Sequence, residues 1–340
     1  MSKSNCTKRT ALNVLCVVLA LILAVMVAAT IYVESMFNRM GTLDHETLSS
    51  SEAEELLNQT EETLDPDFTA PTLKPDDVTI PTEPAEVIVT GENIINIVLV
   101  GQDRREGQGR QRSDSMILCT INTEKKTLMM TSFLRDTYVD IPDFRDRTFE
   151  DNRLNACYAF GGVELLNNAM ELNFGIEIDH NIEVDFTGFE RIVNTLGGVY
   201  IYLTQAEANI VGGGAIAGMN LLNGAQALTY SRIRSLDSDF GRTNRQRTVL
   251  LSMYDSIRRL SPEQISSLVN VLLTMVTTDM TNTDIVKYVV EFVPLLPDLQ
   301  ITTQHIPAVG TYTGAMVRGM SVLIPDLEAN REILRETLGK

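Results

Sequence analysis

The chain has 340 residues, of which 44% are hydrophobic, and it carries a formal net charge of −17. This length allows one large or two ordinary domains, and the apolar content is enough for a substantial core. Proteins that bind nucleic acid usually present a basic face, so nucleic acid is not expected as the partner of a chain with this acidic balance.

The first patterned segment is an apolar run over residues 11–33, interrupted only by Asn13 and Thr30. At about 1.5 Å per residue a helix of this length crosses roughly 30 Å of hydrocarbon, which predicts a transmembrane helix. The tail 1–10 is basic and Glu34 follows the run. The positive-inside rule therefore predicts a single-pass protein of the cell membrane, with a cytoplasmic tail and the bulk of the chain extracellular. A cleavable signal peptide is the alternative, although the run is long for one.

Residues 34–90 have the composition of a linker. They contain 14 Asp and Glu residues against Arg39 and Lys74, together with repeated prolines and serines. Such a segment buries too little apolar surface to fold alone. As a coil it would span roughly 40 Å, which would keep the following domain close to the membrane.

Residues 91–340 show no break in composition and are predicted to form one domain. Apolar runs at 94–100, 116–121 and 128–134 indicate strands, the first two covered on both faces. A further strand is expected at 199–203, and helices at 163–172, 186–196, 224–231, 242–260, 262–276 and 284–293. This order predicts an α/β fold with a central mixed β-sheet flanked by helices.

Cysteine and histidine give little sign of chemistry. Cys119 and Cys157 are the only cysteines after the apolar run, and two buried thiols are favoured over a disulfide between them. No spacing suggests a zinc site. His45, His180 and His305 are scattered, so a Ser-His-Asp arrangement has little support.

Arginine instead recurs beside aspartate at the ends of predicted elements. Arginine offers a planar fork of donors that matches phosphate oxygens, and carboxylates hold the divalent cation that bridges those oxygens. The five patches begin at Gly101, Arg112, Arg135, Ser231 and Asp239. Together they predict a pocket for phosphate and a divalent cation.

Individual patches also have simpler interpretations. Asp103 and Asp114 flank a Gly- and Arg-rich loop that could bring both carboxylates to one cation, or the loop could be solvated with its charges paired locally. Arg135 could likewise form only an ion pair with Asp136 at a strand end.

The last two patches depend on the local backbone. Arg232 and Arg234 would face one side only if the chain is extended there. Arg242 and Gln246 fall one turn apart on a predicted helix whose start could hold an anion. Asp239 could be a member of the site or simply the cap of that helix.

Taken together, these motifs resemble the LytR-CpsA-Psr family. The resemblance is close over about residues 91–255 and looser beyond. It is carried, in family order, by the strings 96–105, 112–118, 133–142, 153–162, 184–189, 196–199, 222–227 and 239–242. Gln102 stands where the family often has Ser, and Leu134 where it often has Pro, so both departures concern loop geometry rather than charge.

The resemblance implies an extracellular, membrane-anchored phosphotransferase. Such an enzyme moves an anionic glycopolymer, for example teichoic acid or capsule, from polyprenyl-pyrophosphate to a peptidoglycan sugar hydroxyl. Asp103 and Asp114 would hold Mg²⁺, with Mn²⁺ as the alternative ion. The residues implied to grip the pyrophosphate are Arg112, Arg135, Arg153, Arg232, Arg234, Arg242 and Gln246.

The resemblance further implies that Asp239, Arg242 and Arg135 act on the reacting phosphate. Apolar helices at 165–172 and 249–260 could line a groove for the lipid, although ordinary core packing is the simpler interpretation of most of those residues. Two other functions stay open, a non-catalytic module that binds lipid-linked glycan and a polyprenyl-pyrophosphate hydrolase.

The predicted topology can be tested by adding protease to intact protoplasts. Because everything after residue 33 is expected outside, digestion should remove nearly the whole chain and leave a small membrane stub, seen by immunoblot. Full protection of residues 91–340 would contradict the outside placement.

Overall fold

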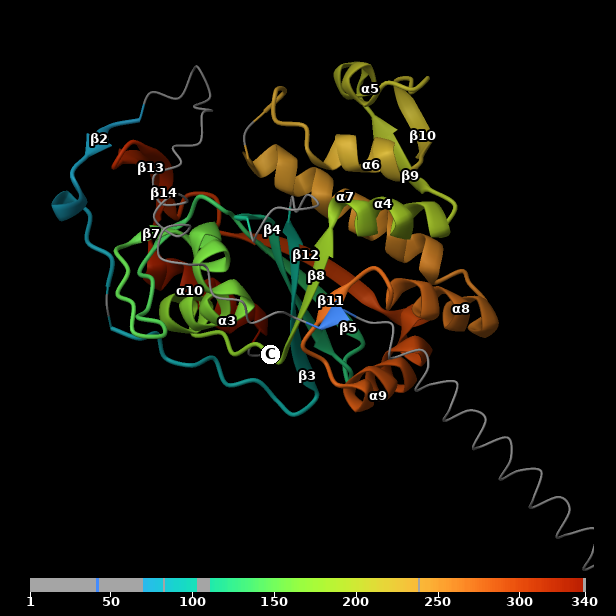
Figure 1. Ribbon diagram of the computed structural model, residues 1–340, viewed down its shortest axis with the longest axis horizontal. Helices are drawn as coiled ribbons and strands as arrows, with labels where there is room; N and C mark the ends of the chain where they lie inside the picture. The colour runs from blue at the N-terminus through green and yellow to red at the C-terminus, as the bar shows by residue number, and fades with distance from the viewer. Residues whose placement is uncertain (1–40, 43–69, 82, 103–110, 238, 339–340) are drawn as a thin grey trace, which may run out of the picture.

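A central seven-stranded sheet organises the protein (Figure 1). The computed structural model describes residues 41–42, 70–81, 83–102, 111–237 and 239–338. In spatial order the strands are β1 (Gly41–Thr42), β11 (Thr277–Thr278), β8 (His180–Asp185), β3 (Ile94–Gln102), β4 (Ser113–Asn122), β5 (Thr127–Phe133) and β12 (Gln300–Ile306). Strand β4 runs antiparallel to β3 and β5, whereas β3–β8 and β5–β12 are parallel. The predicted mixed sheet is therefore confirmed.

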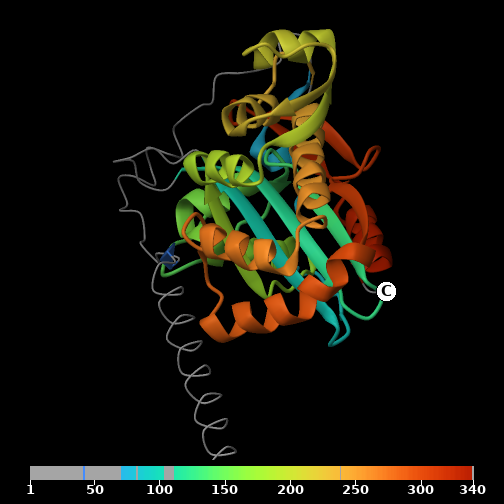
Figure 2. The same cartoon turned by 90° about the vertical axis from the view of Figure 1, so that its right-hand side faces the viewer.

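Helices cover both faces of this sheet (Figure 2). One face carries α3 (Leu154–Phe174) and α10 (Leu327–Leu338). The other carries α4 (Phe186–Thr195), α6 (Gly224–Ser231), α7 (Asp239–Ile257), α8 (Pro262–Leu272) and α9 (Asn282–Phe292). Because side chains alternate along a strand, Val98 and Leu118 pack in the core with α3, while Ile97 and Ile117 pack in the cluster that includes α7 and α9. This two-sided burial explains why the central residues of the two strands, 97–100 in β3 and 116–119 in β4, are apolar.

Smaller elements extend the two layers. Strands β9 (Val199–Leu203) and β10 (Gly218–Leu222) form an antiparallel pair beside α5 (Gln205–Val211). A second small sheet contains β2 (Thr72–Leu73), β13 (Tyr312–Val317) and β14 (Met320–Pro325). The remaining elements are β6 (Tyr138–Val139), β7 (Asn152–Arg153), η1 (Pro75–Asp77) and η2 (Val293–Asp298).

The folded unit begins before residue 91. Strand β2 pairs with β13, and Ile80, Ala85 and Ile88 are buried. The Ile88 N–H donates to the Gly175 carbonyl at 2.8 Å. The predicted linker boundary at residue 90 is therefore too late, because a few apolar residues among the acids and prolines are enough to fix this segment against α3.

The predicted membrane anchor lies outside the described residues, as does most of the predicted linker. Within the described ranges, none of the helices has both the length and the apolarity to span a bilayer.

Two local expectations can be compared directly. The helix predicted at 163–172 follows the glycine pair as expected, because Gly162 has non-helical angles with φ of 67°, and a helical segment that was not predicted precedes it from Leu154. The cysteine prediction is confirmed, since Cys119 and Cys157 are both free and buried. Burial raises the pKa of Cys119 to about 12, so this thiol stays protonated at neutral pH.

Packing of residues 80–88 can be tested at Gly175, the left-handed residue that ends α3. A Cβ there would overlap the Glu86 carbonyl oxygen. Gly175→Ala is expected to lower the free energy of unfolding by about 2 kcal/mol, through backbone strain and this overlap. Gly310 also has positive φ but open space around it, so Gly310→Ala should cost only about 1 kcal/mol in the same denaturant titration. Equal losses would mean that the segment does not press on the helix end.

Candidate functional site

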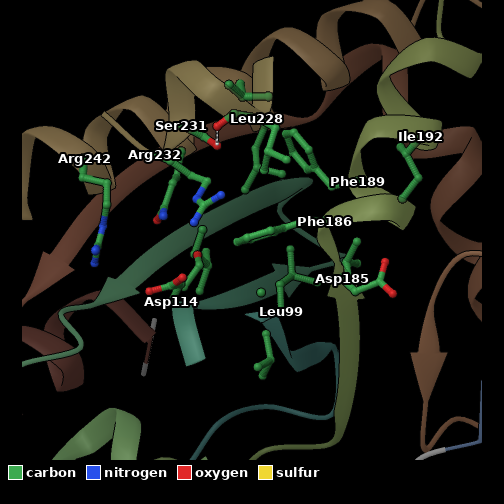
Figure 3. A pocket seen from close by; sticks show the side chains of 18 of the residues that line it. Leu99, Asp114, Asp185, Phe186, Phe189, Ile192, Leu228, Ser231, Arg232 and Arg242 are labelled. Atoms are coloured by element: carbon green, nitrogen blue, oxygen red, sulfur yellow. Dashed lines mark hydrogen bonds between the residues drawn. The ribbon is translucent and has the colours of Figure 1, made fainter. Parts of the chain in front are cut away.

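A cavity of about 160 Å³ lies between the sheet and the helices α4, α6 and α7 (Figure 3). Its polar end is formed by Asp114, Arg232, Arg234, Arg242 and Gln246. Figure 3 shows Asp114, Arg232 and Arg242 on one side of the cavity and Ile192 on the other. The cavity therefore joins a cationic end to an apolar interior.

The interior is lined almost entirely by carbon. Phe186, Phe189 and Ile192 come from α4, and Val249 and Met253 from α7. An apolar cavity with a few polar groups at one end suits an amphiphilic ligand. Of the two helices predicted to line a lipid groove, 249–260 contributes Val249, Leu250 and Met253 to this cavity, whereas residues 165–172 pack on the opposite face of the sheet.

A chain of ion pairs leads from the protein interior to the polar end. Arg153 lies 3.2 Å from Asp136, and Asp136 lies 3.4 Å from Arg135. Asp114 then forms ion pairs with Arg135 at 3.5 Å and with Arg234 at 3.0 Å. The arginine side chains become more exposed along this ion-pair chain, from 5% at Arg153 and 9% at Arg135 to 44% at Arg234. Only the outer end is open to a ligand.

Two arginines that follow α6, Arg232 and Arg234, both line the cavity. Arg232, the C-cap residue of α6, has αR backbone angles (φ −105°, ψ 0°), so the extended conformation expected to bring both arginines to one side is not present at this residue. Ile233 between them is buried. The Arg232 guanidinium lies 4.3 Å from the centre of the Phe186 ring, close enough for a cation–π contact.

One face of α7 supplies the remaining polar groups. Arg242 and Gln246 both line the cavity, as their one-turn spacing predicts, and Val249 and Met253 continue the same face inward. Arg242 is only 2% exposed. A guanidinium in this position is shielded from bulk water, so its attraction for an anion is less screened.

Other predicted site residues are placed differently. Among the described residues, Arg112, Arg135 and Arg153 are not part of the cavity lining, although Arg135 reaches it through Asp114. Asp103 and the side chain of Asp239 lie outside the described part of the structure, so their roles stay predictions. Sequence reasoning gave no role to Phe186, and its position directly after β8 was the available signal.

A divalent cation would find one described carboxylate at the polar end. Within the described ranges, no group of three or more His, Cys, Asp or Glu side chains could hold a metal. Mg²⁺ commonly binds through one or two carboxylates together with substrate phosphate oxygens. Asp114 fits that mode, with the phosphate supplying part of the ligand set.

Comparison with known proteins places this architecture in a family. The LytR_cpsA_psr family matches residues 50–337. TagU of Bacillus licheniformis, named polyisoprenyl-teichoic acid–peptidoglycan teichoic acid transferase, is 37% identical over 166 residues, which cover 48% of this chain and 52% of TagU. Regulatory protein MsrR of Staphylococcus aureus is 34% identical over 168 residues, covering 48% of this chain and 50% of MsrR. The chain thus matches about half the length of these relatives.

Similarity to solved structures extends further along the chain. A structure of TagT bound to LIIa-WTA has a TM-score of 0.60 and 25% identity, and the match covers 73% of this chain and 92% of that one. Since the family match spans most of the sequence and the fold agrees, the chain belongs to the LytR-CpsA-Psr family.

Proposed function

We propose that this protein is a membrane-anchored extracellular phosphotransferase. It moves an anionic glycopolymer from polyprenyl-pyrophosphate to a peptidoglycan sugar hydroxyl. The observation that carries the proposal is the cavity itself, which joins three arginines to an apolar interior. A lipid pyrophosphate has the matching shape, a charged head on a long apolar chain. The names of TagU and of TagT bound to LIIa-WTA support the same class of substrate.

The lipid, the pyrophosphate and the glycan of the proposed substrate lie in that order from the cavity interior to its opening. The polyprenyl chain lies among the side chains of α4 and α7, where its burial removes apolar surface from water. The pyrophosphate lies at the polar end, where Arg232, Arg234 and Arg242 donate to its oxygens in the planar fork geometry that phosphate favours. The glycan then extends outward from the open end.

The transfer replaces the phosphoanhydride bond of the pyrophosphate by a phosphodiester bond to the acceptor sugar. The sugar hydroxyl oxygen attacks the phosphorus that carries the glycan, and the bond from that phosphorus to the oxygen of polyprenyl phosphate breaks. Negative charge grows on this departing oxygen, and arginine donors fixed beforehand stabilise it. Asp239, the acidic residue at the start of α7, would accept the hydroxyl proton.

Magnesium completes the proposed site. Asp114, with Asp103, would hold Mg²⁺, which when bound neutralises charge on the phosphate oxygens. Asp114 also lies between Arg135 and Arg234, since its carboxylate forms ion pairs with both guanidinium groups. The carboxylate therefore has two proposed effects of opposite sign on an anion. It repels the anion when the cation is absent and attracts it through the cation when the cation is bound.

The anchoring part of the proposal rests on sequence. The apolar run 11–33 and the basic tail before it support a membrane helix with the domain outside. Such a tether would keep the cavity near a substrate whose lipid stays in the bilayer.

The two effects of Asp114 can be separated with inorganic pyrophosphate as the probe. Without Mg²⁺, Asp114→Asn should bind pyrophosphate about 5-fold more tightly, because one negative charge beside two arginines is removed. With Mg²⁺, wild type should gain affinity and the variant should gain much less, as measured by titration calorimetry. Asp255→Asn removes an exposed carboxylate paired with Arg258 and is the matched control. An equal gain with Mg²⁺ in wild type and Asp114→Asn would show that Asp114 does not hold the ion.

The catalytic claim can be tested at Arg234, whose side chain is 44% exposed and therefore adds little to the core. Arg234→Ala should lower the rate of polyprenyl phosphate release on the order of 10²-fold at an unchanged thermal midpoint. Arg234→Lys should recover little, because a point charge lacks the planar fork. The assay incubates lipid-linked glycan, Mg²⁺ and peptidoglycan oligomers and resolves the products by mass.

The same assay distinguishes the alternative functions. Release of polyprenyl phosphate without any peptidoglycan product would identify a hydrolase. Binding of the lipid-linked glycan by wild-type protein with no release, whatever the acceptor, would leave only the capture module.

A further inference from the structure

Arg245 lies on α7 between two cavity residues but points elsewhere. It comes three residues after Arg242 and one before Gln246, and it is 6% exposed. Its guanidinium donates to Glu207 at 2.8 Å, to the Ile233 carbonyl at 3.2 Å and to both oxygens of Asp237 at 2.9 and 2.6 Å. All three of its nitrogens are thus engaged, with the planar fork of the guanidinium matched to the Asp237 carboxylate.

The partners of Arg245 come from two different segments. Glu207 belongs to α5, whereas Ile233 and Asp237 belong to the segment 232–237 between α6 and α7, here named the arginine loop. The Ile233 carbonyl lies between the two loop residues that line the cavity. A single buried side chain therefore connects α7, α5 and the arginine loop.

Glu207 is held ready for this contact from its other side. One of its carboxylate oxygens accepts from Arg245, and the other accepts from the N–H and hydroxyl of Thr204, both at 2.9 Å. Burial alone would raise the pKa of Glu207, but the hydrogen bonds from Thr204 and Arg245 lower it overall. The carboxylate stays ionised at neutral pH and keeps the buried guanidinium paired.

Gly241 gives a second, independent sign that the arginine loop is fixed. A Cβ at this position would overlap the carboxylate of Asp237. Asp237 therefore lies between the bare Cα of Gly241 and the guanidinium of Arg245. A side chain at residue 241 would have to displace this carboxylate from its place beside Arg245.

We propose that Arg245 is a positioning residue for the polar end of the cavity. With Asp237, Glu207 and Gly241 it holds the arginine loop so that Arg232 and Arg234 both line the cavity. A loop that is already ordered binds an anion without the entropic cost of ordering it each time. The structural part of this proposal is independent of the proposed function, and its consequence for a lipid pyrophosphate rests on that function.

Hydrogen exchange of the full-length protein in detergent tests the structural part. In Arg245→Met, amides of residues 233–236 should exchange at least about 10-fold faster, because the loop opens locally, while those of β3 to β5 stay unchanged. Arg247→Met is the matched control, since Arg247 is a buried arginine of the same helix that donates to the Gln304 carbonyl. It should leave the loop unchanged.

A second variant keeps the test decisive if Arg245→Met does not fold. The Asp237 side chain is 40% exposed, so Asp237→Asn weakens the lock without leaving a buried charge unpaired, and it should accelerate exchange of the same amides. Unchanged loop exchange in Asp237→Asn and, where it folds, in Arg245→Met would overturn the proposal. An equal increase throughout the domain would also overturn it, since it would mark a general stabilising role.

Binding of farnesyl pyrophosphate tests the consequence. Arg245→Met should weaken binding about 10-fold in the wild-type background but less than about 2-fold in a protein already carrying Arg232→Ala and Arg234→Ala, because Arg245 acts through those two side chains. Equal losses in both backgrounds would contradict positioning. If wild type does not bind this probe at all, the proposed function loses support, and hydrogen exchange still decides whether Arg245 fixes the loop.

Discussion

The ion-pair chain from Arg153 to Arg234 is the interaction on which the site depends. It joins the start of α3, the segments at β5 and β4 and the arginine loop through alternating charges. Burying a guanidinium without a partner would cost free energy of folding. Each carboxylate offsets that cost for the arginine beside it, so the arginines can be held near the cavity. The contacts are 3.0 to 3.5 Å long. The outermost carboxylate, Asp114, is shared by two arginines and is also the group best placed for a cation.

Helix α7 combines three tasks on three of its faces. Arg242 and Gln246 line the cavity, Arg245 holds the arginine loop, and Arg247 donates to the Gln304 carbonyl on β12. Near its start Phe240 stacks on Tyr312 and meets His305 edge-on. These contacts fix the sides of α7 that face away from the cavity, while Arg242 and Gln246 line it. An apolar cavity beside a fixed cationic end has the character of a site for an amphiphilic ligand.

The predictions from sequence succeeded where the signal was local. Alternation and apolar runs located β3, β4 and β5, and α6 has the predicted bounds. They failed where tertiary contacts overrode composition. Residues 80–88 pack against α3 despite their linker-like composition, because three apolar side chains find partners far along the chain. Local signals located the helix after the glycine pair and missed the helical segment that begins at Leu154 before it.

The sequence by itself indicated the class of chemistry, because arginines recur beside aspartates at five predicted element ends, and it determined most of the strands and helices that carry them. Only the tertiary structure decided which arginines meet a ligand. Arg234 and Asp114 are 120 positions apart, and Arg245 and Glu207 are 38 apart. Arg242 and Arg245 are nearly adjacent on one helix, yet one lines the cavity and the other locks a loop. Their i, i+3 spacing makes them neighbours on the helix surface, so only the packing of α5, the arginine loop and the sheet around α7 gives each side chain its own role.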